Sequence, residues 1–484
     1  MKANQKLSDL VFLFCLISGI LLFIYVALRA WYVPATHDES FSWNEIAPHR
    51  VMEIISYNTD SGGMPNNHIL NTLLMKFFAW VFGASIFSVR LPNVLGYLLF
   101  LLYSYKICKK LNQPLLQISG FLLLSLNPYL LEFFGIARGY GIANGLLLAS
   151  CYYLLTWNEH FAPKYLKLSL VFCSLAVLSN FSVFQVYLSL ILVINFVFLI
   201  KSDSKINTLK LFFKYFARKN IYPFINTLIL FLILFEPFRK ILQWHETYGG
   251  INGFWQDSVK GLTSAFCYNQ SYGNILWSSL SFFVIFSLIF ILLAICRAVI
   301  RKVYSENVIL CGLLLILPVI AHILDHYFFG VEFLVPRAGQ YFYVLFILAL
   351  LFTFNFLKNK YTIFTLAVLV ALSTTHLILS LNLKKSVEWP YDAGNKQAIE
   401  CFDSIHATDT AADLSVGITW IFEPGLNFYR TTGKRTWLNK FTREGIEKKE
   451  YDIYYVQAAD TAFLLGKGKI FLKKFPVSDS YIIK

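Results

Sequence analysis

Residues 37–90 read HDESFSWNEIAPHRVMEIISYNTDSGGMPNNHILNTLLMKFFAWVFGASIFSVR and form the one long polar interruption in an apolar N-terminal half. Asp38 and Glu39 stand at the head of this stretch, directly after an apolar span, and a turn-rich run occupies residues 58–68. Adjacent carboxylates at the mouth of a membrane helix repel each other and are costly to desolvate, so they persist where they perform chemistry or hold a cation. The alternative interpretation is a solvated helix end.

The composition of the whole chain is that of a polytopic membrane protein. Hydrophobic residues make up 57% of the 484 residues, charged residues make up 14%, and the mean hydropathy is +0.57. A net charge of +14 would suit a nucleic-acid partner, but the lysines and arginines fall in short loops between apolar spans, where they are a topology signal. Eight cysteines occur singly, without the spacing of a disulfide framework or a zinc knuckle. We therefore expect membrane lipids, and no nucleic acid, as partners.

Windows of about 20 apolar residues predict about eleven membrane spans, near residues 10–32, 91–108, 114–133, 140–157, 165–180, 182–200, 221–238, 275–296, 307–324, 341–357 and 361–382. The first span is too long for a signal peptide and is expected to remain as an anchor. Lysine and arginine gather in alternate loops, which predicts a cytoplasmic N-terminus and, with an odd number of spans, a C-terminus on the outer (periplasmic) face of the inner membrane. The polar stretch and the tail from Lys384 then share that outer face.

Two shorter apolar segments, residues 68–83 and 252–268, are predicted to be helices that lie in the membrane interface. Ordinary loops or one further hairpin are the alternative. Residues 384–484 have more charges and shorter apolar runs, and they predict a small α/β domain without a catalytic constellation of its own. Its expected helices are 396–405 and 424–429, and its expected strands are 414–417, 452–456 and 470–475. The predicted domains are thus a membrane module at 1–383, which includes a first outer loop at 33–90, and the outer-face domain at 384–484.

The order of these features resembles membrane glycosyltransferases of the C-type fold (GT-C), in the branch that contains protein O-mannosyltransferases and the aminoarabinose transferase of lipid A. An acidic pair after the first span, an interfacial helix and the segment from Gly83 to Pro92, with Arg-Leu-Pro opening the next span, carry the likeness. In GIARGYGIANGLLL, Arg138 and Tyr140 start a span much as the family's Arg-x-Tyr does. The family often has a glutamate shortly before that arginine, whereas Glu132 lies further upstream here, which leaves its role open. The resemblance covers about the first 160 residues well and the rest in layout.

The resemblance implies an inverting hexosyl- or pentosyltransferase that uses a polyprenyl-phosphate sugar at the outer membrane interface. One carboxylate would deprotonate the acceptor hydroxyl while cations stabilise the departing phosphate. We expect Asp38 to be the base, with Glu39 as a helper or second ligand, and Arg138 and Arg337 to bind phosphate, with Tyr140 beside them. Arg138 could instead reach lipid headgroups, and Arg337 could pair locally with Glu332.

The remaining candidates are less specific. Asp60 and His68 flank a Gly-Gly turn, where they would line an acceptor entrance or only solvate the turn. His322, Asp325 and His326 have a spacing that could hold a metal, but three such residues at a wet helix end are usually not a site. No cofactor is predicted with certainty, and a divalent cation stays open because members of the resembled fold differ in using one.

Two other functions fit the same layout. A lipid-linked sugar flippase or transporter would show internal repeats and charges near the middle of its spans, and the sequence shows neither. A polysaccharide polymerase or ligase of related architecture would differ in its acceptor, which the sequence does not identify.

Overall fold

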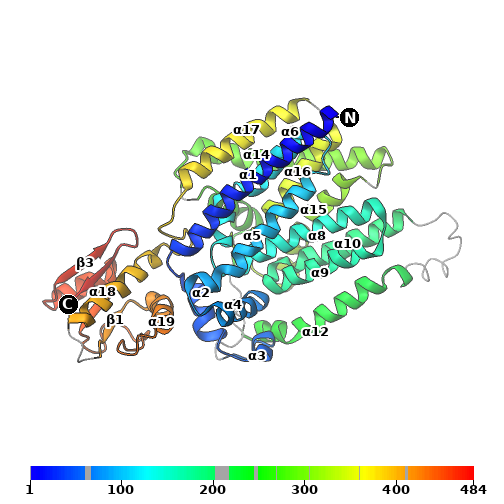
Figure 1. Ribbon diagram of the computed structural model, residues 1–484. Helices are drawn as coiled ribbons and strands as arrows, with labels where there is room; N and C mark the ends of the chain where they lie inside the picture. Colours follow the sequence, from blue (N-terminus) through cyan, green and yellow to red (C-terminus); the bar gives the residue numbers. More distant parts are fainter. Residues whose placement is uncertain are drawn as a thin grey trace. The chain divides into compact units, whose positions relative to one another are not determined.

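The computed structural model describes residues 2–59, 67–201, 217–244, 249–268, 270–304, 306–358, 360–408 and 413–484. Two compact units divide the chain (Figure 1). The helical unit comprises residues 1–25, 94–134 and 139–381, and the mixed unit comprises residues 26–93, 135–138 and 382–484.

The helical unit contains most of α1 (Lys2–Tyr32) and α5 (Ile86–Cys108) and the helices that follow them as far as residue 380. These helices are α6 (Pro114–Ser125), α7 (Pro128–Phe134), α8 (Tyr140–His160), α9 (Pro163–Ser179), η2 (Phe181–Val183), α10 (Phe184–Ile200), α12 (Ile221–Trp244), η3 (Phe254–Lys260), α13 (Gly261–Phe266), α14 (Asn274–Ile300), α15 (Asn307–Phe329), α16 (Tyr341–Leu357) and α17 (Lys360–Ser380).

Each apolar stretch predicted as a span is helical in the structure. Among the described residues, seven helices are long and apolar enough to cross a membrane, or eight if α6 and α7, which meet at a 63° bend, form one broken span. The chain is therefore an integral membrane protein with several spans. The number of eleven crossings and the orientation of the termini stay predictions.

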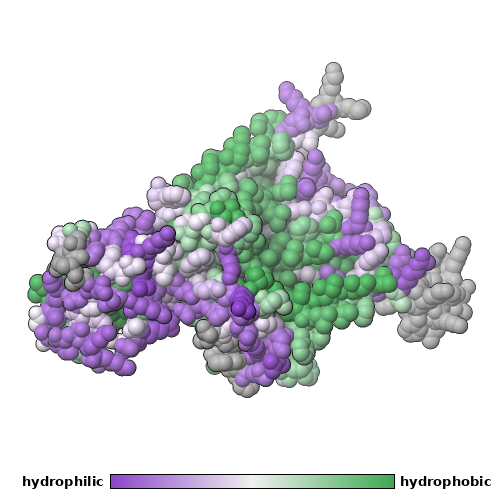
Figure 2. Space-filling view, turned by 60° about the horizontal axis from the view of Figure 1, so that its bottom comes forward, coloured by the Kyte–Doolittle hydropathy of each residue, from purple (hydrophilic) through white to green (hydrophobic). Residues whose placement is uncertain are grey.

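Small residues allow close helix packing in this unit. A Cβ on Gly145 of α8 would lie 2.7 Å from the carbonyl oxygen of Gly96 on α5, so only glycine fits there. The hydroxyl of Ser150 on α8 donates to the carbonyl of Ser169 on α9 at 2.8 Å. Outward-facing side chains are largely apolar, and the helices carry a broad hydrophobic surface in Figure 2. That surface suits a lipid environment.

The mixed unit combines the ends of α1 and α5 with the first loop (residues 33–90) and the C-terminal domain (residues 382–484). The elements of the first loop are α2 (His37–Phe41), η1 (Ser42–Ile46), α3 (Val51–Ile55), α4 (Ile69–Phe82) and the start of α5. Those of the C-terminal domain are η4 (Pro390–Gly394), α18 (Asn395–Thr408), β1 (Val416–Ile418), η5 (Trp420–Phe422), α19 (Glu423–Thr432), β2 (Ile453–Gln457), α20 (Ala458–Gly466), β3 (Phe471–Phe475) and β4 (Ser480–Ile483).

The C-terminal domain is built on a four-stranded sheet in the order β1-β2-β4-β3. β1 and β2 pair in parallel, with Val416 opposite Ile453, while β4 pairs antiparallel with both β2 and β3. Helices α18 and α19 bury Phe402 and Leu426 against this sheet. The two predicted helices and the three predicted strands are confirmed, with β1 overlapping its predicted range, whereas α20 and β4 were not predicted.

The segment predicted as the first interfacial helix forms α4, which has two different faces. Ile69, Met75 and Ala79 are buried, whereas Phe77 and Trp80 are exposed. The second such segment, 252–268, contains η3 and α13. Both helices are confirmed, and their location at a membrane interface stays a prediction.

The contacts divide the chain differently from the boundary expected at residue 383. Residues 26–93 and 135–138, which the sequence places with the membrane spans, share a compact unit with residues 382–484. The first loop and the C-terminal domain are therefore one structural body in space, although they are far apart in the sequence.

Candidate active site

Asp38 lies on α2, the short helix that starts five residues after α1 ends. Its side chain is 16% exposed, and its Oδ2 is 3.5 Å from Nη2 of Arg138, which is only 2% exposed. The same guanidinium donates to the hydroxyl of Ser42 at 3.2 Å and to the backbone carbonyl of Asp38 at 3.4 Å. The structure thus brings together two residues that the sequence selected a hundred positions apart. Arg138 is buried against α2 rather than extended toward headgroups.

Glu39, the other member of the acidic pair, has no exposed surface. Its carboxylate accepts the Nε–H of Arg90 at 3.0 Å and an Nη2–H of the same side chain, which is also fully buried. It further accepts the backbone N–H of Thr36 at 2.7 Å, which caps α2, and that of Ala137 at 2.7 Å. The remaining Arg90 donors bind three backbone carbonyls at the end of α1, those of Ala30, Val33 and Pro34.

All five N–H donors of Arg90 therefore have acceptors. The Glu39–Arg90 pair joins α2, the end of α1 and the start of α5, and it also holds the 135–138 segment through Ala137. The Glu39–Arg90 ion pair thus links several elements of the mixed unit, and the Glu39 carboxylate contacts other protein groups rather than solvent.

The 135–138 segment that carries Arg138 has a second support. The carbonyl of Ala137 accepts the side-chain N–H of Asn71 on α4 at 3.0 Å. Asn71 in turn accepts the side-chain N–H of Asn93 on α5 at 2.8 Å. Asn71, Asn93 and Ala137 are all buried. Arg138 is thereby fixed in two ways: Asn71 holds the backbone next to it, and α2 and Ser42 bind its guanidinium.

The C-terminal domain also contacts the first residue of α2. Asp392, which is 1% exposed, accepts the backbone N–H of His37 at 2.6 Å and the side-chain N–H of Asn395 at 2.8 Å. Burial raises the pKa of Asp392 and the charges of Asp38 and Glu39 raise it further, against the two N–H donors, which lower it. Sequence reasoning found no chemistry in this domain.

His37 also binds the C-terminal domain through its side chain. Its Nδ1 lies 2.8 Å from the carbonyl oxygen of Ile421. Burial lowers the pKa of the His37 imidazole, against this carbonyl and Asp38, which raise it. A neutral ring protonated at Nδ1 donates to the carbonyl, so the hydrogen bond selects that tautomer.

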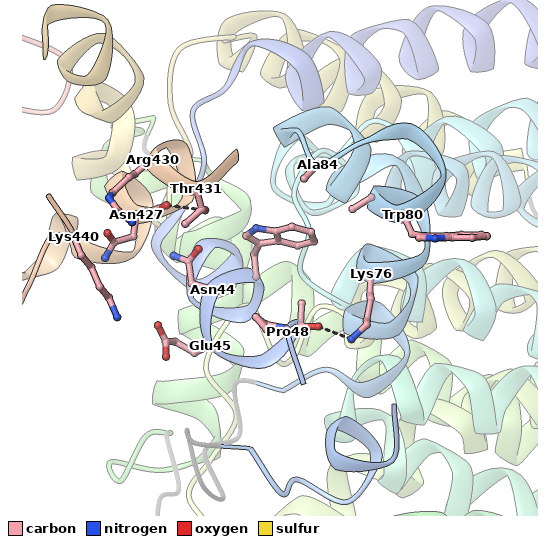
Figure 3. A pocket seen from close by; sticks show the side chains of 13 residues that line it. Asn44, Glu45, Pro48, Lys76, Trp80, Ala84, Asn427, Arg430, Thr431 and Lys440 are labelled. Atoms are coloured by element: carbon pink, nitrogen blue, oxygen red, sulfur yellow. Dashed lines mark hydrogen bonds between the residues drawn. The ribbon is translucent and has the colours of Figure 1, made fainter. Parts of the chain in front are cut away.

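A cavity of about 630 Å³ lies between the first loop and α19 within the mixed unit. Figure 3 shows Asn427, Arg430 and Lys440 along one side and Lys76 and Trp80 of α4 along the other. The ring of Trp80 points away from the cavity and is 80% exposed.

The charges around this cavity are unequal. The lining contains three cationic side chains, those of Lys76, Arg430 and Lys440, against one carboxylate, that of Glu45. The Lys76 ammonium donates to the carbonyl of Ala47 at 3.0 Å and is thereby fixed in the wall. An anionic group is the electrostatically favoured occupant.

The structure places the other predicted site residues separately. In the mixed unit, His68 is buried at the N-cap of α4. Asp60 lies outside the described residues. In the helical unit, Tyr140 begins α8 with its ring centroid 5.2 Å from that of Phe133, and Arg337 is half-buried in the turn before α16.

The three candidate metal ligands of α15 have separate partners in the helical unit. His322 Nε2 is 2.7 Å from the Tyr341 hydroxyl, Asp325 accepts from Gln185 at 3.0 Å, and His326 Nδ1 is 2.9 Å from a backbone carbonyl. Among the described residues, no group of three or more His, Cys, Asp or Glu side chains is placed to hold a metal ion.

Glu132, whose role the resemblance left open, is fully buried in the helical unit and accepts the hydroxyl of Tyr268. Tyr268 follows α13, so this bond ties α7 to the segment predicted as the second interfacial helix.

The sequence matches no protein-family model and no curated protein. Solved structures match it over almost its full length. ArnT from Cupriavidus metallidurans in the apo state has 10% sequence identity and a TM-score of 0.56, with 98% of each chain covered. The chain has the ArnT fold. ArnT bound to undecaprenyl phosphate gives a TM-score of 0.53 at the same identity and coverage. The ArnT fold confirms the fold class predicted from the sequence, a GT-C membrane fold with a small C-terminal α/β domain.

Proposed function

We propose that this protein is an integral membrane glycosyltransferase that transfers a sugar from a polyprenyl-phosphate donor to an acceptor hydroxyl, with Asp38 as the general base. The observation that carries the proposal is a partly exposed carboxylate fixed beside a buried arginine, in a chain with the ArnT fold over 98% of its length. The ArnT structure with undecaprenyl phosphate supports a donor of this class.

The chemistry that we propose is a single inverting displacement. The acceptor oxygen attacks the anomeric carbon of the donor sugar, the bond from that carbon to the phosphate oxygen breaks, and polyprenyl phosphate leaves. Asp38 takes the hydroxyl proton in the same step. A cation must offset the charge that develops on the phosphate, and Arg138, which lies in the same unit as Asp38, is our candidate for this task. The phosphate-binding roles of Arg337 and Tyr140 stay predictions. Arg138 orients Asp38 through the 3.5 Å contact and adds positive charge next to it.

Glu39 receives a different role in this proposal from the one expected of it as a helper or second ligand. Its oxygens accept Arg90 and two backbone N–H groups, and it has no exposed surface. We propose that Glu39 holds α2 in place and takes no part in proton transfer.

The cavity beside η1 is our proposed acceptor site. It begins a few residues after Asp38 along the same helical segment, and its three cations against one carboxylate favour an acceptor that carries an anionic group. The exposed apolar face of α4 borders it through Trp80, which favours an acceptor held in a membrane. His68 and Asp60 remain proposed neighbours of the acceptor path. The face that carries this site is proposed to be the outer one, with the N-terminus in the cytoplasm of a cell with an inner membrane.

The test is sugar transfer by the purified protein from a panel of polyprenyl-phosphate sugars, with native mass spectrometry of any lipid that co-purifies. Asp38→Asn keeps the shape of the side chain but removes its basic oxygen, so turnover should fall about 10²- to 10⁴-fold while the donor lipid still binds. Asp403→Asn, in the same unit but paired with Arg435, is the matched control and should retain turnover. A stable Asp38→Asn protein with wild-type turnover would remove Asp38 as the base. Movement of the lipid-linked sugar across a vesicle membrane without transfer would favour a flippase instead.

A further inference from the structure

The C-terminal domain contributes several hydrogen bonds to the segment around Asp38. Asp392 accepts the backbone N–H of His37, the residue directly before the proposed base, at 2.6 Å. The backbone N–H of Ala35 donates to the Tyr429 hydroxyl at 2.8 Å. The side chains of His37 and Asn44 donate to two carbonyls of the same domain, those of Ile421 and Pro424, at 2.8 and 2.9 Å. Residues 35–44 are thus anchored at both ends.

Asp392 differs from the other three contacts because it is a carboxyl group with almost no exposed surface. Burying a carboxyl is costly, and an apolar residue of similar size would serve packing alone at less cost. Its neighbours include Asp38 and Glu39, whose like charges make the place still less favourable. A costly group kept at such a place points to a requirement of α2 rather than of the domain core.

The geometry of the Asp392 carboxyl also defines its task. One oxygen binds the first N–H of α2 and the other binds Asn395 at the start of α18, so the carboxyl is a fixed link from α18 to the backbone next to Asp38. Displacement of a catalytic group by about 1 Å can cost about a hundredfold in rate. A shift of α2 would move Asp38 by a comparable amount.

We propose that Asp392 is a positioning residue that holds Asp38 at the distance required for proton transfer, which makes the C-terminal domain part of the catalytic unit. This inference rests on the proposed function. It predicts an effect on kcat, because Asp392 is buried and acts on Asp38 through the backbone of His37.

The test compares two replacements of the same carboxyl. Asp392→Ala removes the acceptor of the His37 N–H and that of the Asn395 side chain. In Asp392→Asn the amide oxygen can still accept from His37, and the side-chain amide of Asn395 can turn to offer its oxygen to the new NH₂ group. We expect Asp392→Ala to lose about tenfold to a hundredfold in kcat with little change in donor KM, and Asp392→Asn to keep most of the wild-type kcat.

Hydrogen–deuterium exchange provides a second readout. The amide of His37 should exchange faster in Asp392→Ala and should stay protected in Asp392→Asn. Asp403→Asn is the control for a weakened domain, because Asp403 binds Arg435 through both oxygens, at 2.6 and 2.7 Å, rather than a residue of the 35–44 segment. It should lower stability without changing kcat or the exchange of His37.

The outcomes separate cleanly. Wild-type kcat in Asp392→Ala, a loss confined to KM, or an equal loss in Asp403→Asn at equal stability would each overturn the positioning role. If the wild-type protein transfers no sugar from any donor, the proposed function fails. The exchange of the His37 amide then still decides whether Asp392 holds residues 35–44. Exchange in Asp392→Ala at the wild-type rate would overturn that structural role as well.

Discussion

The variant Glu39→Gln should unfold more readily than the wild type, although Glu39 takes no part in the proposed reaction. Gln keeps one acceptor oxygen but puts an NH₂ group where the other oxygen stood. In either amide orientation this group faces one N–H of Arg90 and one backbone N–H, of Thr36 or of Ala137. The fully buried Arg90 guanidinium then has three carbonyl acceptors but no counter-charge.

The expected cost follows from these contacts. Removing one partner of a buried ion pair destabilises a protein by about 3–5 kcal/mol, because the other charge stays buried without compensation. For a unit of this size, 1 kcal/mol shifts the melting temperature by about 2–4 °C, so the melting temperature should fall by about 6–20 °C. Asp38→Asn removes the charge of a partly exposed side chain at a longer contact of 3.5 Å, and Arg138 keeps its bonds to Ser42 and to a backbone carbonyl, so the cost should be smaller than that of Glu39→Gln.

The assay measures melting temperature and turnover on the same purified variants in detergent. We expect opposite patterns for the two neighbouring acids. Glu39→Gln should be unstable yet retain substantial turnover per folded molecule at low temperature, whereas Asp38→Asn should be stable and nearly inactive. Replacing Glu39 and Arg90 together with apolar residues should recover part of the stability lost by Glu39→Gln, because no unpaired charge remains.

One result would refute this reasoning. If Glu39→Gln has the melting temperature of the wild type and its turnover is lower by a hundredfold or more, Glu39 takes part in the reaction and the Glu39–Arg90 ion pair is not what holds α2. The role of base would then be shared or transferred to Glu39.

Three further predictions concern other parts of the molecule. Burial lowers the pKa of His37 below 6.5. The stability that the neutral ring contributes is therefore present above that pH and is lost as the pH falls through the lower pKa of the folded state. The melting temperature of the wild type should drop more between about pH 7 and pH 5 than that of His37→Gln, and an equal drop in the two proteins would contradict this. Gly145→Ala should destabilise the helical unit by about 1–3 kcal/mol, because the new Cβ would lie 2.7 Å from a backbone oxygen. Gly466→Ala is the control and should be nearly neutral, because no atom lies within 4 Å of its new Cβ. Equal melting temperatures for the two variants would show that α5 and α8 can separate without cost. Single cysteines at Pro48 and Lys440, which line one cavity, should react with a membrane-impermeant label from the same side, and labelling from opposite sides would exclude the mixed unit as described.

Apolar length and residue order allowed much of the fold to be predicted. The eleven apolar stretches predicted as spans are helical among the described residues, as expected because a membrane leaves the backbone few other ways to satisfy its hydrogen bonds; seven or eight of the helices are long and apolar enough to cross one. In the C-terminal domain, turn residues and short alternating runs located three of the four strands. β4 was missed because the run Ser480–Ile483 is short and stands at the end of the chain.

The candidate site was only partly predictable. Asp38 and Arg138 were selected from their places at the ends of apolar stretches, and the structure puts them 3.5 Å apart. The Glu39–Arg90 pair joins residues 51 positions apart, and no local pattern shows which of two adjacent carboxylates turns inward. Asp392 could not be recognised either, because its function depends on the backbone of His37, 355 residues away, and a backbone N–H leaves no trace in the sequence.

The mixed unit is assembled from three stretches of chain, and this division has a consequence for biosynthesis. Roughly 290 residues separate the end of its first stretch, Asn93, from the start of its last, Asn382. At about 5–20 residues per second, the ribosome reaches Asn382 some 15–60 seconds after it has added Asn93. During that interval the membrane helices are inserted while Asp38 lacks the contacts that fix its place. A nascent chain cut short within its spans therefore carries the proposed base without its support, and we expect it to be inactive even when it is correctly inserted.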